Sequence, residues 1–100
     1  MYKVYICCAS GMSSCLLSSK IEKLISDKNY DISIQVCNQY TLETMNDKPD
    51  IILLTPYMKY VRRQIERLYK DIPILDITMK EYGTMDGEKI LERIRKELSL

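Results

Sequence analysis

The 100-residue chain contains no histidine, no tryptophan and no phenylalanine. Without histidine, the protein has no imidazole for acid–base catalysis, no phosphohistidine of its own and none of the commonest zinc ligand. Any reactive group must therefore be a cysteine, a hydroxyl, a lysine or a carboxylate. Isoleucine, leucine, methionine and tyrosine are left to build the core.

The chain also lacks a strong charge bias and a long apolar run. Fifteen basic against fourteen acidic residues give a net charge of +1, which argues against nucleic acid or an anionic membrane as the main partner. No stretch approaches the ~18 apolar residues of a membrane span, and residues 1–4 do not have the layout of a signal peptide. We therefore expect one soluble, cytoplasmic domain over residues 1–100.

Four cysteines stand at positions 7, 8, 15 and 37, and none belongs to a C-x-x-C motif. In a reducing compartment they are expected to be free thiols, and zinc ribbons and thioredoxin-like sites are excluded. Cys15, inside a predicted helix, and Cys37, at the end of a predicted strand, are expected to be packing residues. Neither a metal nor another cofactor is expected.

Segments of strand and helix periodicity alternate along the chain. Strands are predicted over residues 2–7, 32–37, 50–54 and 73–77. Helices are predicted from Met12 onward, around 42–46, over 57–69 and over 90–98. The apolar positions assigned to the three longer helices are Met12, Leu16, Leu17, Ile21, Leu24 and Ile25, then Val61, Ile65 and Leu68, then Ile90, Leu91, Ile94 and Leu98. Turns are predicted at residues 82–83 and 86–87, with Asp86 capping the last helix.

This alternation predicts an α/β fold of a single domain. We expect a four-stranded parallel sheet in the order 2-1-3-4 with helices on both faces, flavodoxin-like and similar to low-molecular-weight tyrosine phosphatase. In such sheets the ligand binds at the carboxyl ends of the strands, near the switch point between the first and third strands. The segment directly after Cys7 is therefore expected at the functional site.

That segment, residues 8–14, is built from small residues that let backbone N–H groups converge on a tetrahedral anion. The helix that follows adds partial positive charge at its N-terminus. A cysteine beside such a group of donors, Cys8, is expected to have a lowered pKa and to be partly ionised. The alternative is a structural loop, because strand-to-helix loops often contain glycine and serine and cysteine is often a small buried residue.

Other known phosphate-binding motifs are absent from the sequence. The sequence has no Walker A motif and no G-x-G-x-x-G, and Thr55 follows the third strand where a receiver domain needs aspartate. The Cys-x5-Arg loop of tyrosine phosphatases and arsenate reductases would require arginine where Ser14 stands. Without a guanidinium to stabilise the transition state, a loop can hold a phosphocysteine but hydrolyses it slowly. This pattern favours phosphoryl transfer over hydrolysis.

Three blocks of the sequence resemble one known family. Residues 6–14, ICCASGMSS, are similar to the C-S-A-G-M-S-T signature of the lactose/cellobiose (chitobiose) IIB component of the phosphoenolpyruvate-dependent sugar phosphotransferase system. Residues 50–56 and 82–91 also match, in the order of the family. The register of Gly11 and Met12 aligns the signature cysteine with Cys8. Thr55 stands where family members often have glycine.

The resemblance implies that Cys8 accepts a phosphoryl group from a histidine of a separate IIA protein. Cys8 would then pass it to a disaccharide, of cellobiose or chitobiose type, bound by the membrane IIC permease. The residues implied in holding the phosphate are Ala9, Ser10, Gly11, Met12, Ser13 and Ser14. Two alternatives stay open: a phosphatase or arsenate-reductase-like enzyme, and a regulatory module that only senses phosphorylation.

The helix predicted over 57–69 is basic on much of its surface. Its cations, with the lysine that follows, are Lys59, Arg62, Arg63, Arg67 and Lys70. A solvated face with an Arg62–Glu66 pair is the default interpretation. A docking surface, or a distant cation that folding brings near a phosphocysteine, is the alternative.

Overall fold

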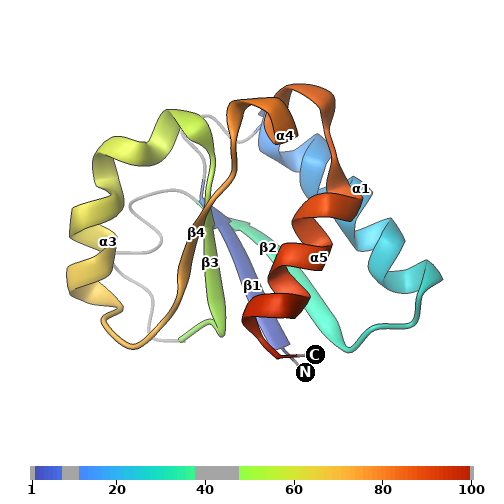
Figure 1. The fold of residues 1–100 in the computed structure, drawn as a ribbon, viewed down its shortest axis with the longest axis horizontal. Helices are drawn as coiled ribbons and strands as arrows, with labels where there is room; N and C mark the ends of the chain where they lie inside the picture. The colour runs from blue at the N-terminus through green and yellow to red at the C-terminus, as the bar shows by residue number, and fades with distance from the viewer. Residues whose placement is uncertain (1, 8–11, 38–47, 100) are drawn as a thin grey trace.

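The computed structural model describes residues 2–7, 12–37 and 48–99 (Figure 1). The elements are β1 (Tyr2–Cys7), α1 (Met12–Asp27), β2 (Ile32–Cys37), β3 (Ile51–Leu54), η1 (Pro56–Val61), α3 (Arg62–Leu68), β4 (Ile74–Asp76), α4 (Met79–Thr84) and α5 (Gly87–Glu97). The strands form one parallel sheet in the order β2-β1-β3-β4, which confirms the predicted fold class and strand order. The helix expected around residues 42–46 lies outside the described residues.

The sheet is covered on both faces, so the core has two layers. One layer joins α1 and α5 to the sheet, and its buried side chains include Ile21, Ile94 and Ile51. The other joins η1 and α3 to the opposite face. Figure 1 shows α3 on one side of the sheet and α1 and α5 on the other. All four residues of β3 are buried, as a continuous apolar run in a central strand requires.

Two leucines assigned to the core are exposed instead. Leu16 is 67% exposed, because α1 buries the stripe through Leu17, Ile21 and Ile25, and the preceding residue points about 100° away. Leu68 is 49% exposed, because the stripe Val61–Ile65 continues four residues on to Tyr69.

The connections differ from the predictions in two places. The segment after β3 begins as the 3₁₀-helix η1 and becomes α-helical only at Arg62. Residues 82–83 were expected in a turn but lie inside the short helix α4. This helix forms because Thr78 caps it: the Glu81 backbone N–H donates to the Thr78 hydroxyl oxygen, and the Thr78 N–H donates to the Glu81 carboxylate.

The start of α5 follows the prediction. The backbone N–H of Lys89 donates to Asp86 Oδ1 at 3.2 Å, so Asp86 is the N-cap. The first helical residue, Gly87, is buried against α1, and a Cβ there would lie 3.3 Å from Leu24 Cδ1. The glycine therefore permits a close approach of two helices. Of the helices in the described ranges, none is long and apolar enough to cross a bilayer.

Candidate functional site

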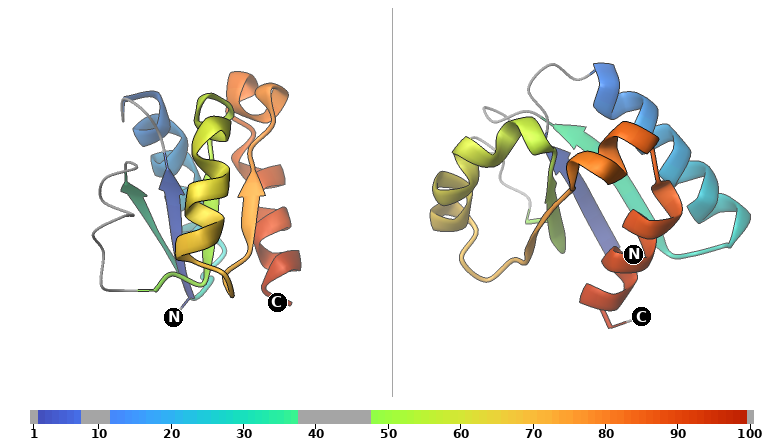
Figure 2. Two further views of the ribbon diagram at one scale, coloured as in Figure 1. Left: turned by 90° about the vertical axis from the view of Figure 1, so that its left-hand side faces the viewer. Right: turned by 45° about the horizontal axis from the view of Figure 1, so that its top comes forward.

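The carboxyl ends of β1 and β3 lie side by side at one edge of the sheet, where Cys7 is the register partner of Leu54. Strand β1 ends at this edge, and the next described element along the chain is the 16-residue helix α1, which begins at Met12. From β1 the chain crosses to β2 on one side, while β3 lies on the other. This edge is therefore the switch point of the sheet, the expected position of a ligand site. The right-hand view of Figure 2 brings it forward.

The predicted site residues fall into two groups. Cys8, Ala9, Ser10 and Gly11 lie outside the described residues. Met12, Ser13 and Ser14 form the first turn of α1, so their backbone N–H groups belong to the positive end of the helix dipole. The fold thus begins a helix at the fifth residue after the central strand β1, at the edge where the nucleophile is predicted.

Thr55 holds the end of β1. Its backbone N–H and its hydroxyl both donate to the carbonyl oxygen of Cys7, at 3.3 Å and 3.2 Å. Its own carbonyl oxygen accepts from the backbone N–H of Met58 at 2.9 Å, in the first turn of η1. The side chain is 1% exposed. This contact was not predicted, although the place of Thr55 directly after the buried strand β3 was a signal that it lies at this edge.

Cys7 and Cys37 end the neighbouring strands β1 and β2 as register partners and are both buried. The Cys37 thiol lies 3.6 Å from the carbonyl oxygen of Ile6, to which it donates. Hydrogen bonding with the Cys37 side chain lowers the pKa of the Cys7 thiol and outweighs burial, which raises it. The prediction that Cys37 is a packing residue is confirmed. The side chain of Cys7 belongs to the same core layer, so it is not a reactive group of the edge.

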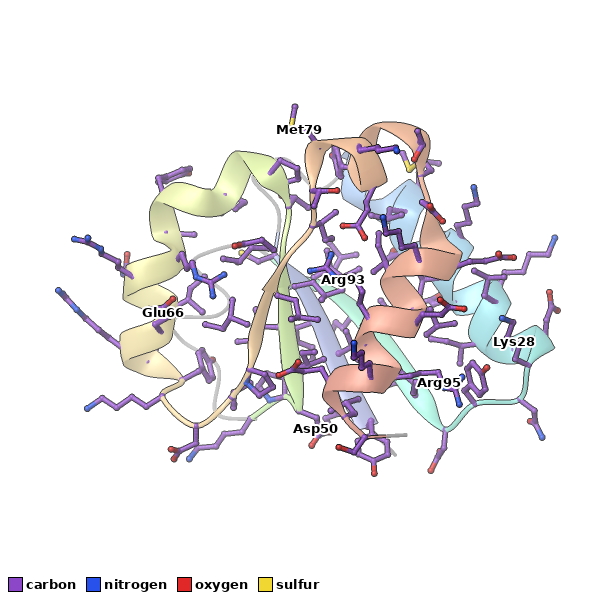
Figure 3. All side chains as sticks on the ribbon, viewed as in Figure 1. Lys28, Asp50, Glu66, Met79, Arg93 and Arg95 are labelled. Atoms are coloured by element: carbon purple, nitrogen blue, oxygen red, sulfur yellow. The ribbon has the colours of Figure 1, made fainter. Side chains whose placement is uncertain are left out.

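Two arginines, Arg62 and Arg93, form ion pairs with carboxylates. Arg62 pairs with Glu66 at 2.7 Å, as predicted, and also with Asp76 at 2.8 Å. Arg93 of α5 pairs with Glu81 at 2.6 Å. Figure 3 labels Arg93 and Glu66 on opposite sides of the sheet, flanking β4. These guanidinium groups anchor helices to β4, which is separated from β1 by β3.

The edge has the chemistry of an anion site. Backbone N–H groups at the start of α1 carry partial positive charge, and an anion there is stabilised without a metal ion or a guanidinium. A thiol at the same place would be favoured as the thiolate for the same reason. The start of α1 can therefore stabilise an anionic group at this edge of the sheet.

The sequence is similar to those of a known protein family. Residues 3–93 match the family model of the PTS system lactose/cellobiose-specific IIB subunit. The chain is 30% identical over 95 residues to the cellobiose-specific EIIB component of Lactococcus lactis subsp. lactis, with 88% of each chain covered. It is 27% identical to the oligo-beta-mannoside-specific EIIB component of Bacillus subtilis, with 93% of this chain and 92% of the relative covered.

Solved structures give the same result. The solution structure of a cellobiose-specific IIB component from Borrelia burgdorferi aligns with a TM-score of 0.75 and 33% identity, covering 91% of this chain and 85% of the other. The lactose-specific IIB domain from Streptococcus pneumoniae shares the fold, with a TM-score of 0.81, 19% identity and 95% of both chains covered. IIB components are phosphotransferases that work with a IIA donor protein and a IIC membrane permease. The chain belongs to the lactose/cellobiose-specific IIB family of the sugar phosphotransferase system.

Proposed function

We propose that the thiolate of Cys8 accepts a phosphoryl group from a phosphohistidine of the IIA protein and passes it to a disaccharide bound by IIC. The observation that carries this proposal is the position of Cys8 in the chain. It is the first residue after a central strand, and the 16-residue helix α1 begins four residues later. An ionised sulfur at that point would face the partial positive charge of the helix N-terminus.

Two in-line displacements make up the cycle. In the first, the sulfur of Cys8 attacks phosphorus, a P–S bond forms, and the P–N bond to the donor imidazole breaks. In the second, a sugar hydroxyl attacks, the P–O bond forms as the P–S bond breaks, the hydroxyl proton passes to water, and the thiolate is restored. Amide groups at the start of α1 would stabilise the charge on the equatorial oxygens in both steps.

The phosphate is held, in this proposal, by the chain that follows Cys8. Its members are Ala9, Ser10, Gly11, Met12, Ser13 and Ser14. Residues 1–100 would act as one IIB domain in the cytoplasm, where the thiol stays reduced. We propose a sugar of cellobiose or chitobiose type, because the names of two of the similar proteins specify cellobiose.

The direct test is to incubate the protein with phosphorylated IIA and to locate the phosphate by mass spectrometry of peptides. We expect one phosphoryl group on Cys8, and none on the Cys8→Ser variant. Cys15→Ser serves as the matched control and should be labelled like the unmodified protein. Label that persists on Cys8→Ser would contradict the assignment of the nucleophile.

A second stage tests transfer to sugar. Labelled protein mixed with IIC-containing membranes and cellobiose should lose its phosphate to the sugar, whereas in buffer alone it should lose phosphate only slowly. Rapid release of inorganic phosphate, or turnover of p-nitrophenyl phosphate, would instead support a phosphatase. Phosphorylation on Cys8 without any transfer to a sugar would support a regulatory module.

A further inference from the structure

The carbonyl oxygen of Cys7 is the last acceptor of β1, and Thr55 supplies two donors to it. The backbone N–H of Thr55 lies 3.3 Å away and the hydroxyl 3.2 Å away. A carbonyl oxygen has two lone pairs, so both are engaged by one residue. Thr55 itself is fixed, because it is 1% exposed and its carbonyl oxygen accepts the first backbone hydrogen bond of η1.

This carbonyl belongs to the peptide unit between Cys7 and Cys8. The unit is planar and its electrons are shared between carbonyl and amide, so donors to its oxygen act on the whole peptide group. Hydrogen bonds accepted by a carbonyl polarise the whole peptide group, which makes its N–H a stronger donor. The hydroxyl of Thr55 therefore acts on the peptide group at the carboxyl end of β1.

We propose that Thr55 is a positioning residue for the reaction of Cys8. Its hydroxyl orients and polarises the peptide that leads into Cys8, and so stabilises the thiolate and the phosphorylated form. The inference rests on the proposed function, in which Cys8 carries the phosphoryl group.

The central test is Thr55→Val, which removes the hydroxyl but keeps the shape of the side chain and the backbone N–H. We expect the rate of phosphoryl transfer from IIA to fall by about 10-fold, as the loss of one hydrogen bond in a closed site would give. The midpoint of the pH profile for Cys8 alkylation should also move to higher pH, because the thiolate loses stabilisation.

Thr55→Ser and Thr55→Ala form a second pair. Both lose the methyl group, but only serine keeps the hydroxyl, so the pair remains informative if Thr55→Val folds poorly. Serine should restore the transfer rate and the alkylation midpoint to within about 2-fold and a few tenths of a pH unit, while alanine should behave like valine.

Thr84→Val is the matched control. Its hydroxyl also donates to a backbone carbonyl, that of Lys80, at 2.7 Å, but in α4. It should leave both readouts unchanged. If Thr55→Val lowers only the melting temperature, or if serine and alanine behave alike, Thr55 is purely structural and the proposal is overturned. Failure of the proposed function is a separate result: unmodified protein that IIA does not label on Cys8.

Discussion

The guanidinium of Arg93 reaches from α5 to the buried carboxylate of Glu81 on α4, with Nη1 and Oε1 2.6 Å apart. Glu81 is 2% exposed, and Arg93 also donates to the backbone carbonyl oxygen of Asp76 at 3.0 Å. One ion pair therefore joins α4, α5 and the end of β4. Because the Glu81 carboxylate is buried, the fold can hold its negative charge only while Arg93 pairs with it.

The first prediction concerns that dependence. Arg93→Gln removes the cation and leaves a buried carboxylate, so the free energy of unfolding should fall by about 3 kcal/mol. Urea unfolding followed by circular dichroism measures the change. Arg63→Gln removes the same charge from an exposed position on α3 and should cost less than about 0.5 kcal/mol. Equal effects of the two variants would show that the ion pair does not stabilise the fold.

The second prediction concerns acid. Burial raises the pKa of the Glu81 carboxyl, but hydrogen bonds from the Thr78 backbone and pairing with Arg93 outweigh burial and lower the pKa below its ordinary value of 4.5. The folded state thus binds a proton on Glu81 less readily than the unfolded state. The contribution of Glu81 to stability is complete above pH 4.5 and is lost as the pH falls through the lowered pKa.

Unfolding curves collected from pH 3 to pH 7 test this sign. The unmodified protein should lose stability more steeply below pH 4.5 than Glu81→Gln, which has no proton to bind at this position. The opposite order, with Glu81→Gln more sensitive to acid, would mean that the pKa is raised in the fold.

The third prediction concerns Arg62, one of the cations that the sequence analysis considered as a partner for the phosphate. Its guanidinium is engaged by Asp76 and Glu66, and the three side chains are 36–49% exposed. Arg62→Gln should lower the free energy of unfolding by only about 0.5–1 kcal/mol, because solvent screens the pairs. The rate at which IIA phosphorylates Cys8 should change less than about 3-fold, far less than the loss of rate expected when a cation that stabilises the transition state is removed. A loss of several powers of ten would assign Arg62 to the site.

The fourth prediction compares two glycines. Gly83 lies in α4 with no atom within 4 Å of an added Cβ, so Gly83→Ala should stabilise the protein by about 0.5–1 kcal/mol through helix propensity. At Gly87 an added Cβ would meet Leu24 at 3.3 Å and the buried Ile21 at 3.4 Å. Gly87→Ala should bring no gain, because the packed side chains of Leu24 and Ile21 would have to shift to make room. Equal shifts in melting temperature for the two variants would contradict the close approach of α1 and α5.

The fifth prediction concerns Cys7 and Cys37, which are 0% and 6% exposed. Although hydrogen bonding with the Cys37 side chain lowers the pKa of Cys7, burial keeps alkylating reagents away from the sulfur. Peptide mapping after brief treatment with iodoacetamide should show little label on either residue in folded protein, and full label in urea. Fast labelling of Cys7 in the folded protein would mean that β1 opens readily at its carboxyl end.

The sequence alone determined most of the architecture. Strand and helix periodicities are local properties of the chain, so they placed β1, β2 and β3 within one residue of their observed bounds. Alternating strands and helices predicted a parallel sheet, and the expected order 2-1-3-4 is the one observed, which places the edge where the candidate site lies. For the nucleophile itself, the assignment to Cys8 rests on sequence and stays a prediction.

Only the tertiary structure decided which neighbouring residue faces the core and which groups meet across the fold. Leu17 and Tyr69 are buried where Leu16 and Leu68 are not, because the final rotation of each helix is set by its contacts with the sheet. Residues 82–83 became helical because the side chain of Thr78 capped the turn before them. Thr55 reaches Cys7 across 48 positions of the chain, a contact that follows from strand register. Local patterns carry no information about such partners, since register and helix rotation are fixed only when the whole core assembles.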